Sequence, residues 1–230
     1  MLVTEQQPLN FPKRPGWPKA GPGRPRSPNA KVLHRSRGCI NHREPLHVTM
    51  RVNKDVPNLR TGRFIRAFRQ TLAFCSARAG FRVVHYSVQS NHVHCLIEAD
   101  NADTLGRGMK SFGSRFAKVV NRVFGRSGKV LDGRYHLRRL KTPKEVRNAL
   151  AYVLLNARKH YFQRNRRTPA AAKVDTLSSG AWFDGWKDVV PDPPGRFREV
   201  ATPRTWLLAT GWRRHRLIRT SEVPGNGFLF

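Results

Sequence analysis

The stretch Ser90–Glu98, which reads SNHVHCLIE, places two histidines on either side of one hydrophobic residue. The residues before it alternate as in a strand, where successive side chains point to opposite faces, so His92 and His94 share a face. Two neutral imidazoles on one face suit a divalent cation with open coordination positions. Glu98 shares the face but lies about 13 Å further along, at 3.3 Å per residue, too far for direct ligation.

A second stretch, Leu150–His160, reads LAYVLLNARKH and predicts a helix. Tyr152 and Asn156 lie one turn apart at the edge of its apolar face. An amide oxygen can add a harder metal ligand, and a phenol can act as a nucleophile toward a phosphodiester. Each feature alone is more often structural, Tyr152 being then a boundary aromatic with its hydroxyl in water. Tyr161, nine residues on, is rotated about 180° from Tyr152 on the helix, so we expect that the two cannot face one metal ion.

The overall charge indicates the substrate class. Lys and Arg number 44 against 14 acidic residues, a formal net charge of +30, which favours polyanions and makes nucleic acid the expected partner. We expect no membrane association, because there is no basic amphipathic anchor and no apolar run of transmembrane length. The acidic residues scarcely cluster, so a two-metal nuclease built on carboxylates is poorly supported.

The cysteines and the N-terminus indicate the compartment. Cys39, Cys75 and Cys95 are an odd number at wide spacing, which argues against a disulfide framework and a Cys-x-x-Cys zinc site. No apolar signal-peptide core follows Met1. We therefore expect a cytoplasmic, nucleoid-associated protein in which the cysteines are bystanders.

The two motifs together resemble those of the HUH-type single-tyrosine transposases, particularly the REP-associated tyrosine transposases. The resemblance covers Pro45–His160 and implies a ferredoxin-like catalytic fold, Mg²⁺ or Mn²⁺ as cofactor, and single-stranded DNA with hairpin sequences as partner. It implies cleavage that leaves a 5′-phosphotyrosine and a free 3′-hydroxyl. By position, His92 and His94 become metal ligands, Tyr152 the nucleophile and Asn156 the third ligand. The family pattern often has Asn-Pro after the tyrosine, whereas this chain has Asn156-Ala157.

The elements that must position these residues follow from periodicity. The pattern predicts strands at Leu46–Val52, Phe81–Gln89 and His92–Ala99, the last two joined by a tight Ser90-Asn91 turn, and a weak fourth strand at 133–140. It predicts helices at Ile65–Cys75, terminated by Gly80, at Leu105–Val123, and from a Thr142–Glu145 capping box onward. We expect an α+β fold: a ferredoxin-like antiparallel sheet with helices on one face.

Three regions are expected. Residues 1–45 read as a disordered basic arm, in which Gly23–Arg26 resembles an AT-hook core but chance is the stronger explanation. Residues 46–170 form the catalytic domain, and 171–230 are a Trp-rich extension. Its aromatic residues either stack on unpaired bases or anchor the extension on the domain; they are Trp182, Phe183, Trp186, Trp206 and Trp212.

The leading hypothesis is a metal-dependent transposase or related strand-transfer nuclease, acting as a monomer or homodimer. The alternatives are a domesticated, non-catalytic DNA- or RNA-binding protein and an RNA-binding protein of ribosomal type. Neither alternative needs a phenol beside two imidazoles. If the metal site exists, both His92 and His94 should lie on one sheet face that opens to solvent.

Overall fold

The computed structural model of the protein describes residues 38–167, 173–191, 195 and 197–225. Contacts divide the chain between Leu33 and His34, and all described residues belong to the second unit. The AT-hook-like Gly23–Arg26 lies outside the described residues. Within the expected arm, Ile40 is buried in the core and the Arg139 side chain donates to the Cys39 carbonyl at 2.7 Å.

Five strands form one sheet in the order β2-β3-β4-β1-β5, and every neighbouring pair is antiparallel. The strands are β1 (Leu46–Arg51), β2 (Ala77–Arg78), β3 (Phe81–Val88), β4 (His92–Ala99) and β5 (His136–Arg139). With the two-residue β2 set aside, the order is that of a ferredoxin-like sheet, in which two crossover helices each skip one strand. The α+β class and the antiparallel sheet are confirmed.

The helices and helical turns occupy the connections and the C-terminal segment. They are α1 (Gly62–Cys75), α2 (Ala102–Phe124), α3 (Pro143–Leu154), α4 (Asn156–Asn165), η1 (Gly180–Trp182), α5 (Trp206–Ala209) and η2 (Gly211–His215). The predicted capping box is present: Thr142 Oγ1 accepts from the Glu145 amide, and the Glu145 carboxylate accepts from the Thr142 amide.

The predicted end of α1 is wrong. The helix stops at Cys75 with Ser76 as its C-cap, and the chain then forms β2, which pairs with the start of β3. Gly80 instead occupies the turn between β2 and β3 with φ +71, where a side chain would be strained. Gly80 thus has the left-handed conformation expected of it, but it lies in the turn between β2 and β3 and not at the end of α1.

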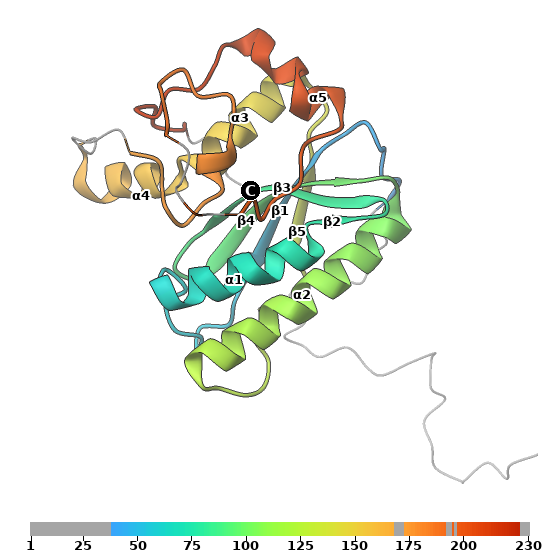
Figure 1. The fold of residues 1–230 in the computed structure, drawn as a ribbon, viewed down its shortest axis with the longest axis vertical. Coiled ribbons are helices and arrows are strands. Elements are labelled where there is room, and N and C mark those ends of the chain that lie inside the picture. The colour runs from blue at the N-terminus through green and yellow to red at the C-terminus, as the bar shows by residue number, and fades with distance from the viewer. Residues whose placement is uncertain (1–37, 168–172, 192–194, 196, 226–230) are drawn as a thin grey trace, which may run out of the picture. The chain divides into compact units, whose positions relative to one another are not determined.

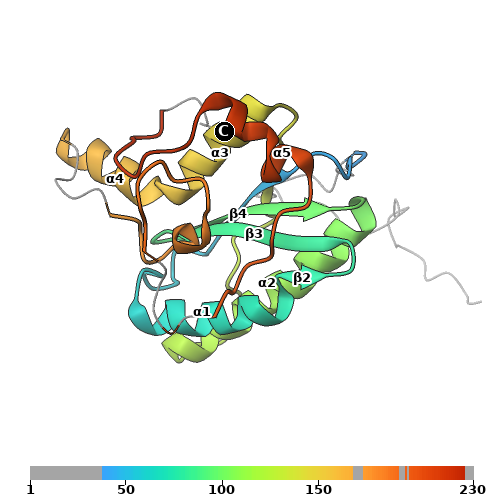
Figure 2. The ribbon, with the colours of Figure 1, turned by 45° about the horizontal axis from the view of Figure 1, so that its top comes forward.

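The crossover helices α1 and α2 cover one face of the sheet, as expected, and α3 adds cover on the other face. α1 and α2 pack on the face that carries Val93, Cys95 and Ile97, whereas α3 and the C-terminal segment pack on the opposite face (Figures 1 and 2). That second face carries Val84 and Leu96, which form a core with α3. Apolar residues on both faces of the central strands need cover on both sides.

The C-terminal segment is held by its aromatic residues. Phe183, Trp186 and Trp212 are buried, and the Phe183 ring lies 5.1 Å from Trp186 and 5.3 Å from Trp212. Trp182 Nε1 donates to Glu199 Oε2 at 2.7 Å. For these four residues the anchoring interpretation holds. Trp206 differs, because 51% of it is exposed.

Candidate active site

The two histidines of the first motif lie side by side on β4. The β1 register sets Arg51 opposite His92 and Thr49 opposite His94, so all four side chains share one face. The predicted hairpin is present, with Val88 opposite Val93 and the Gln89 amide donating to the His92 carbonyl at 2.8 Å. The sheet therefore fixes both imidazoles through a short turn on one side and β1 on the other.

The imidazole nitrogens form a connected row. His92 Nδ1 lies 2.8 Å from Asn91 Oδ1, which can only accept, so that nitrogen carries the proton and His92 Nε2 presents a lone pair. His92 Nε2 lies 3.0 Å from His94 Nε2. On its other side, His94 Nδ1 lies 3.0 Å from Thr49 Oγ1 and 3.2 Å from His47 Nε2.

The nitrogen separation fits a shared cation. Two nitrogens that each lie about 2.1 Å from one ion at a right angle are about 3.0 Å apart. A hydrogen bond between the two imidazoles accounts for the same separation without a metal. Within the described residues, no group of three or more His, Cys, Asp and Glu side chains could hold a metal ion. A third protein ligand would thus have to be of another type.

Asn156 supplies a candidate for that ligand. It is fully buried; its amide nitrogen faces the Tyr152 hydroxyl, to which it can donate, and its Oδ1 has no hydrogen-bond partner. Leaving a buried polar atom unsatisfied costs about 1–3 kcal/mol, so the Asn156 Oδ1 atom needs an explanation such as a bound ion. Imidazole nitrogens favour a transition-metal ion and an amide oxygen favours Mg²⁺ or Mn²⁺, so of these two expected ions Mn²⁺ suits the mixed donor set better.

Tyr152 lies against the histidines. Its ring centroid is 5.1 Å from that of His94 and 5.8 Å from that of His47, in both cases edge-on, and 7% of the residue is exposed. The alternative of a boundary tyrosine in water is therefore not what the fold shows. Burial raises the pKa of the Tyr152 hydroxyl, and the neighbouring Asn156 side chain partly counteracts this rise.

The helix that carries Tyr152 and Asn156 is interrupted between them. α3 ends at Leu154 and α4 begins at Asn156, because Leu155 has φ −109 and ψ 17. The expected continuous helix through His160 is thus wrong. The expected rotation of about 180° between Tyr152 and Tyr161 holds only for one continuous helix. In the structure Tyr161 lines the same cavity as His92.

This cavity, of about 580 Å³, opens beside His92. Its wall includes Arg60, His160, Tyr161 and Arg164. His92 is partly exposed there, whereas His94 is 1% exposed beneath it. The expectation that both rings open to solvent holds for His92 and is wrong for His94, which is enclosed by Thr49, His47 and Tyr152 rather than by the apolar core.

Burial keeps the imidazoles neutral. It lowers the pKa of His47 to about 4, with Arg138 and His92 adding to the effect, and lowers the pKa of His92 to about 4, with His160 and Arg51 adding. The pKa of His94 falls well below its usual value, first by burial and then through the surrounding basic groups. At neutral pH these nitrogens are free of the charge that would exclude a metal ion.

The sequence motifs did not reveal three neighbours of the site. His47 and Thr49 could have been found from the alternation of Leu46–Val52, but their pairing with β4 needs the sheet order. Lys159, only 3% exposed, places its Nζ 4.7 Å from the Tyr152 ring centroid, and burial lowers its pKa. The sequence around Lys159, within the predicted helix, gave no signal of this position.

The remaining candidates lie elsewhere. His85 and Tyr86 are packed, as expected: His85 contacts Ser179, and Tyr86 donates to Glu199 at 2.6 Å. His136 is exposed on β5. The three cysteines form no disulfide. Among the described helices, none is long and apolar enough to cross a membrane.

Comparison with known proteins gives a limited likeness. No family model and no curated protein matches the chain. Two similar solved structures are a REP-associated tyrosine transposase bound to a REP hairpin and a candidate transposase from Deinococcus radiodurans. The first is 16% identical, with 56% of this chain and 74% of that chain covered and a TM-score of 0.46. The second is 13% identical, with 60% and 100% covered and a TM-score of 0.37. Identities and TM-scores this low leave the function to be inferred from the side chains.

Proposed function

We propose that this protein cleaves and rejoins single-stranded DNA beside hairpins, with Tyr152 as nucleophile and Mg²⁺ or Mn²⁺ held by His92, His94 and Asn156. The observation that carries the proposal is the 3.0 Å separation of the two histidine Nε2 atoms, with the Tyr152 ring 5.1 Å from His94. A phenol, a buried amide oxygen without a partner and two neutral imidazoles at one place suit phosphoryl transfer better than packing alone.

The chain's own residues would divide the work as follows. The Tyr152 hydroxyl oxygen attacks the phosphorus, the bond from phosphorus to the 3′ oxygen breaks, and that oxygen gains the proton lost by the phenol. The products are a 5′-phosphotyrosine and a free 3′-hydroxyl, and attack by another 3′-hydroxyl reverses the step. When bound, the cation polarises the phosphate and neutralises developing charge.

The nucleophile needs help, because a phenol has a pKa near 10 and burial raises that of Tyr152 further. Lys159 is the nearest candidate. Its ammonium lies over the ring and makes no other hydrogen bond or ion pair among the described residues. A buried cation at this position favours the phenolate over the phenol. Lys159 is therefore assigned as a positioning and charge-stabilising residue.

The test is covalent capture of DNA. The protein is incubated with Mn²⁺ and single-stranded oligonucleotides that carry the imperfect palindromes found beside its gene, and the adduct is mapped by mass spectrometry. We expect an adduct at Tyr152 that Tyr152→Phe abolishes without loss of fold, since one hydroxyl is removed. Tyr161→Phe is the matched control, because Tyr161 lines the adjacent cavity. An adduct that persists in Tyr152→Phe, or maps to Tyr161, contradicts the assignment.

A non-catalytic DNA-binding protein is the second candidate. Two observations favour it: Tyr152 is 7% exposed, and the described residues hold no group of three His, Cys, Asp or Glu metal ligands. The predicted difference is simple. A binding protein shifts hairpin DNA in a salt-dependent manner but gives no adduct with any flanking palindrome, with or without Mn²⁺.

A further inference from the structure

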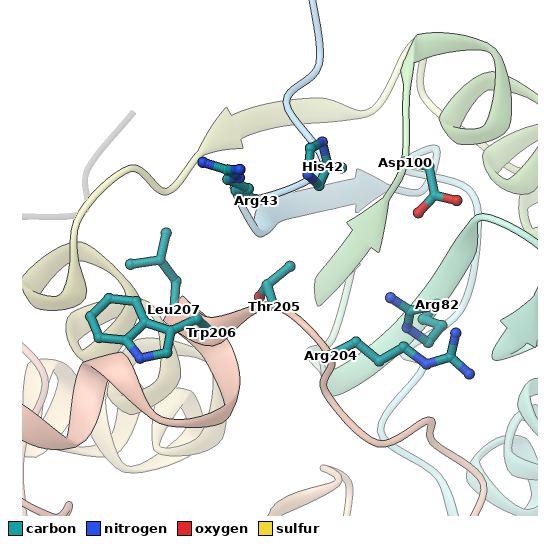
Figure 3. A pocket seen from close by; sticks show the side chains of 8 residues that line it. All are labelled: His42, Arg43, Arg82, Asp100, Arg204, Thr205, Trp206 and Leu207. Atoms are coloured by element: carbon teal, nitrogen blue, oxygen red, sulfur yellow. The ribbon is translucent and has the colours of Figure 1, made fainter.

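A second cavity, of about 500 Å³, lies at the opposite end of β4 from His92. Its wall includes His42, Arg43, Arg82, Asp100, Arg204 and Trp206 (Figure 3). Asp100 follows His94 by six residues, which at 3.3 Å per residue is about 20 Å. The volume is within the range of small-ligand sites, roughly 300–1,000 Å³, and the site described above uses none of these residues.

The cavity is rich in positive charge that the fold does not use. Arg43 and Arg204 are exposed, and within the described residues neither guanidinium has an ion-pair partner. Arg82 is different, because its Nε donates to Glu98 Oε2 at 3.0 Å. With Arg82 neutralised by Glu98, the two exposed arginines outnumber Asp100, and this excess of positive charge attracts an anion such as a phosphate.

Trp206 adds an aromatic surface to this basic wall. Trp186 and Trp212 of the same segment are buried, so the exposed half of Trp206 contrasts with them. The ring is held in place, because a Cβ on Gly211 would lie 2.6 Å from it and the Arg214 guanidinium lies 4.9 Å from its centroid. A fixed, exposed indole with guanidinium neighbours is the type of surface on which unpaired bases stack.

A buried carboxylate fixes the wall to the sheet. Glu98, 1% exposed, accepts hydrogen bonds from the Arg204 amide and from the amide and hydroxyl of Thr205, at 2.8–3.0 Å. The Thr205 hydroxyl also caps α5, which Trp206 begins. The site is thus preformed on rigid elements, which lowers the entropic cost of binding.

We propose that this cavity binds an unpaired nucleotide of single-stranded DNA, with the base stacked on Trp206 and the phosphates of the strand attracted by the separate guanidinium groups of Arg43 and Arg204. The proposal rests on the proposed function, because it assigns the nucleotide to the strand that Tyr152 cleaves. A separation of about 20 Å is within the reach of a few nucleotides of an extended single strand. The cavity therefore adds a contact outside the cleavage position and extends the length of strand that the protein holds.

The first experiment measures the affinity of the full chain for a fluorescent single-stranded oligonucleotide by anisotropy. Trp206→Ala should weaken binding about five- to a hundredfold, the range given by base stacking on an aromatic ring. Trp206→Phe should restore most of the loss. Phe74→Ala is the matched control. Phe74 is an exposed aromatic residue on α1, the helix that covers the other face of the sheet. Arg204→Gln should also weaken binding, and its matched control is Arg107→Gln, which removes an exposed arginine on α2.

The second experiment uses the unaltered protein, so it does not depend on the folding of a variant. Oligonucleotides that carry 5-iododeoxyuridine at successive positions are irradiated, and the crosslinked residue is identified. We expect crosslinks to Trp206 from positions at one fixed separation from the phosphate cleaved by Tyr152. Crosslinks that never fall on Trp206 or its neighbours, or equal affinities for Trp206→Ala and Phe74→Ala, would overturn the proposal.

The outcomes separate this proposal from the proposed function. A Tyr152 adduct together with binding that ignores Trp206 overturns the nucleotide site and leaves the transposase assignment intact. Binding that depends on Trp206 without any adduct supports the nucleotide site and contradicts the cleavage reaction. Tighter Trp206-dependent binding to RNA than to DNA of the same sequence overturns the assignment of a DNA occupant.

Discussion

His85 tests how the C-terminal segment is held on the sheet. Its imidazole is 4% exposed, its Nδ1 lies 3.2 Å from Ser179 Oγ, and its ring meets that of Phe183 edge-on at 5.4 Å. Burial lowers the pKa of His85 to about 3, and Arg198 adds to the effect. The native protein therefore keeps His85 neutral in conditions where an unfolded chain would protonate it.

The size of the effect follows from linkage between proton binding and folding. An unfolded histidine has a pKa of about 6.5, so between pH 6.5 and pH 3 the unfolded state binds a proton that the native state does not. The free energy of unfolding therefore falls as the pH falls through this window. Between pH 7 and pH 5 the contribution of His85 amounts to about 2 kcal/mol.

The assay compares urea unfolding at pH 7 and pH 5, at constant ionic strength, for the wild type and His85→Asn. The asparagine retains a polar partner for Ser179 but carries no titrating group. The wild type should lose about 2 kcal/mol more than the variant between the two pH values. His215→Asn, at an exposed position in η2, controls for removal of a histidine. Equal pH dependence in His85→Asn and the wild type would refute the argument.

Three further outcomes are expected. Glu98→Ala leaves Arg82 unpaired and removes the anchor of Thr205, so it should lower the free energy of unfolding by about 3–5 kcal/mol in urea titrations. Lys159→Met keeps the hydrophobic stem but removes the charge over Tyr152; single-turnover adduct formation should slow at least about tenfold, with hairpin affinity unchanged because Lys159 is buried. Chelation with EDTA should abolish the adduct and leave the urea unfolding curve in place, since the fold forms around a protein core.

The parts of the fold that short-range signals determine were predictable. The Ser90-Asn91 turn and the Thr142–Glu145 capping box each act within four residues, and both are present. The cover of the second sheet face was not predictable in this way. It depends on Val84, displaced by a register shift in β3, and on contacts between α3 and a C-terminal segment without periodicity.

In the candidate site, too, short-range spacing predicted some residues, and others depend on contacts between distant parts of the chain. The alternation of side chains along β4 was enough to predict His92 and His94 on one face. Helical spacing was enough to predict Tyr152 beside Asn156. Their neighbours His47 and Thr49 come from β1, more than 40 residues earlier, and reach His94 through the β1–β4 register. The break at Leu155 was hidden for a different reason: no proline or glycine marks it, and only the backbone dihedrals show it.

The chain's high positive charge and its neutral histidines belong to one electrostatic arrangement. Neighbouring basic groups, from His47 to Lys159, add to burial in lowering the pKa of His94. The same excess of positive charge draws phosphates toward the molecule. A carboxylate-rich site would oppose that attraction and would hold a cation more tightly before DNA arrives. A site of neutral nitrogens instead leaves most of the charge balance to the incoming phosphate, so metal affinity should rise when single-stranded DNA binds.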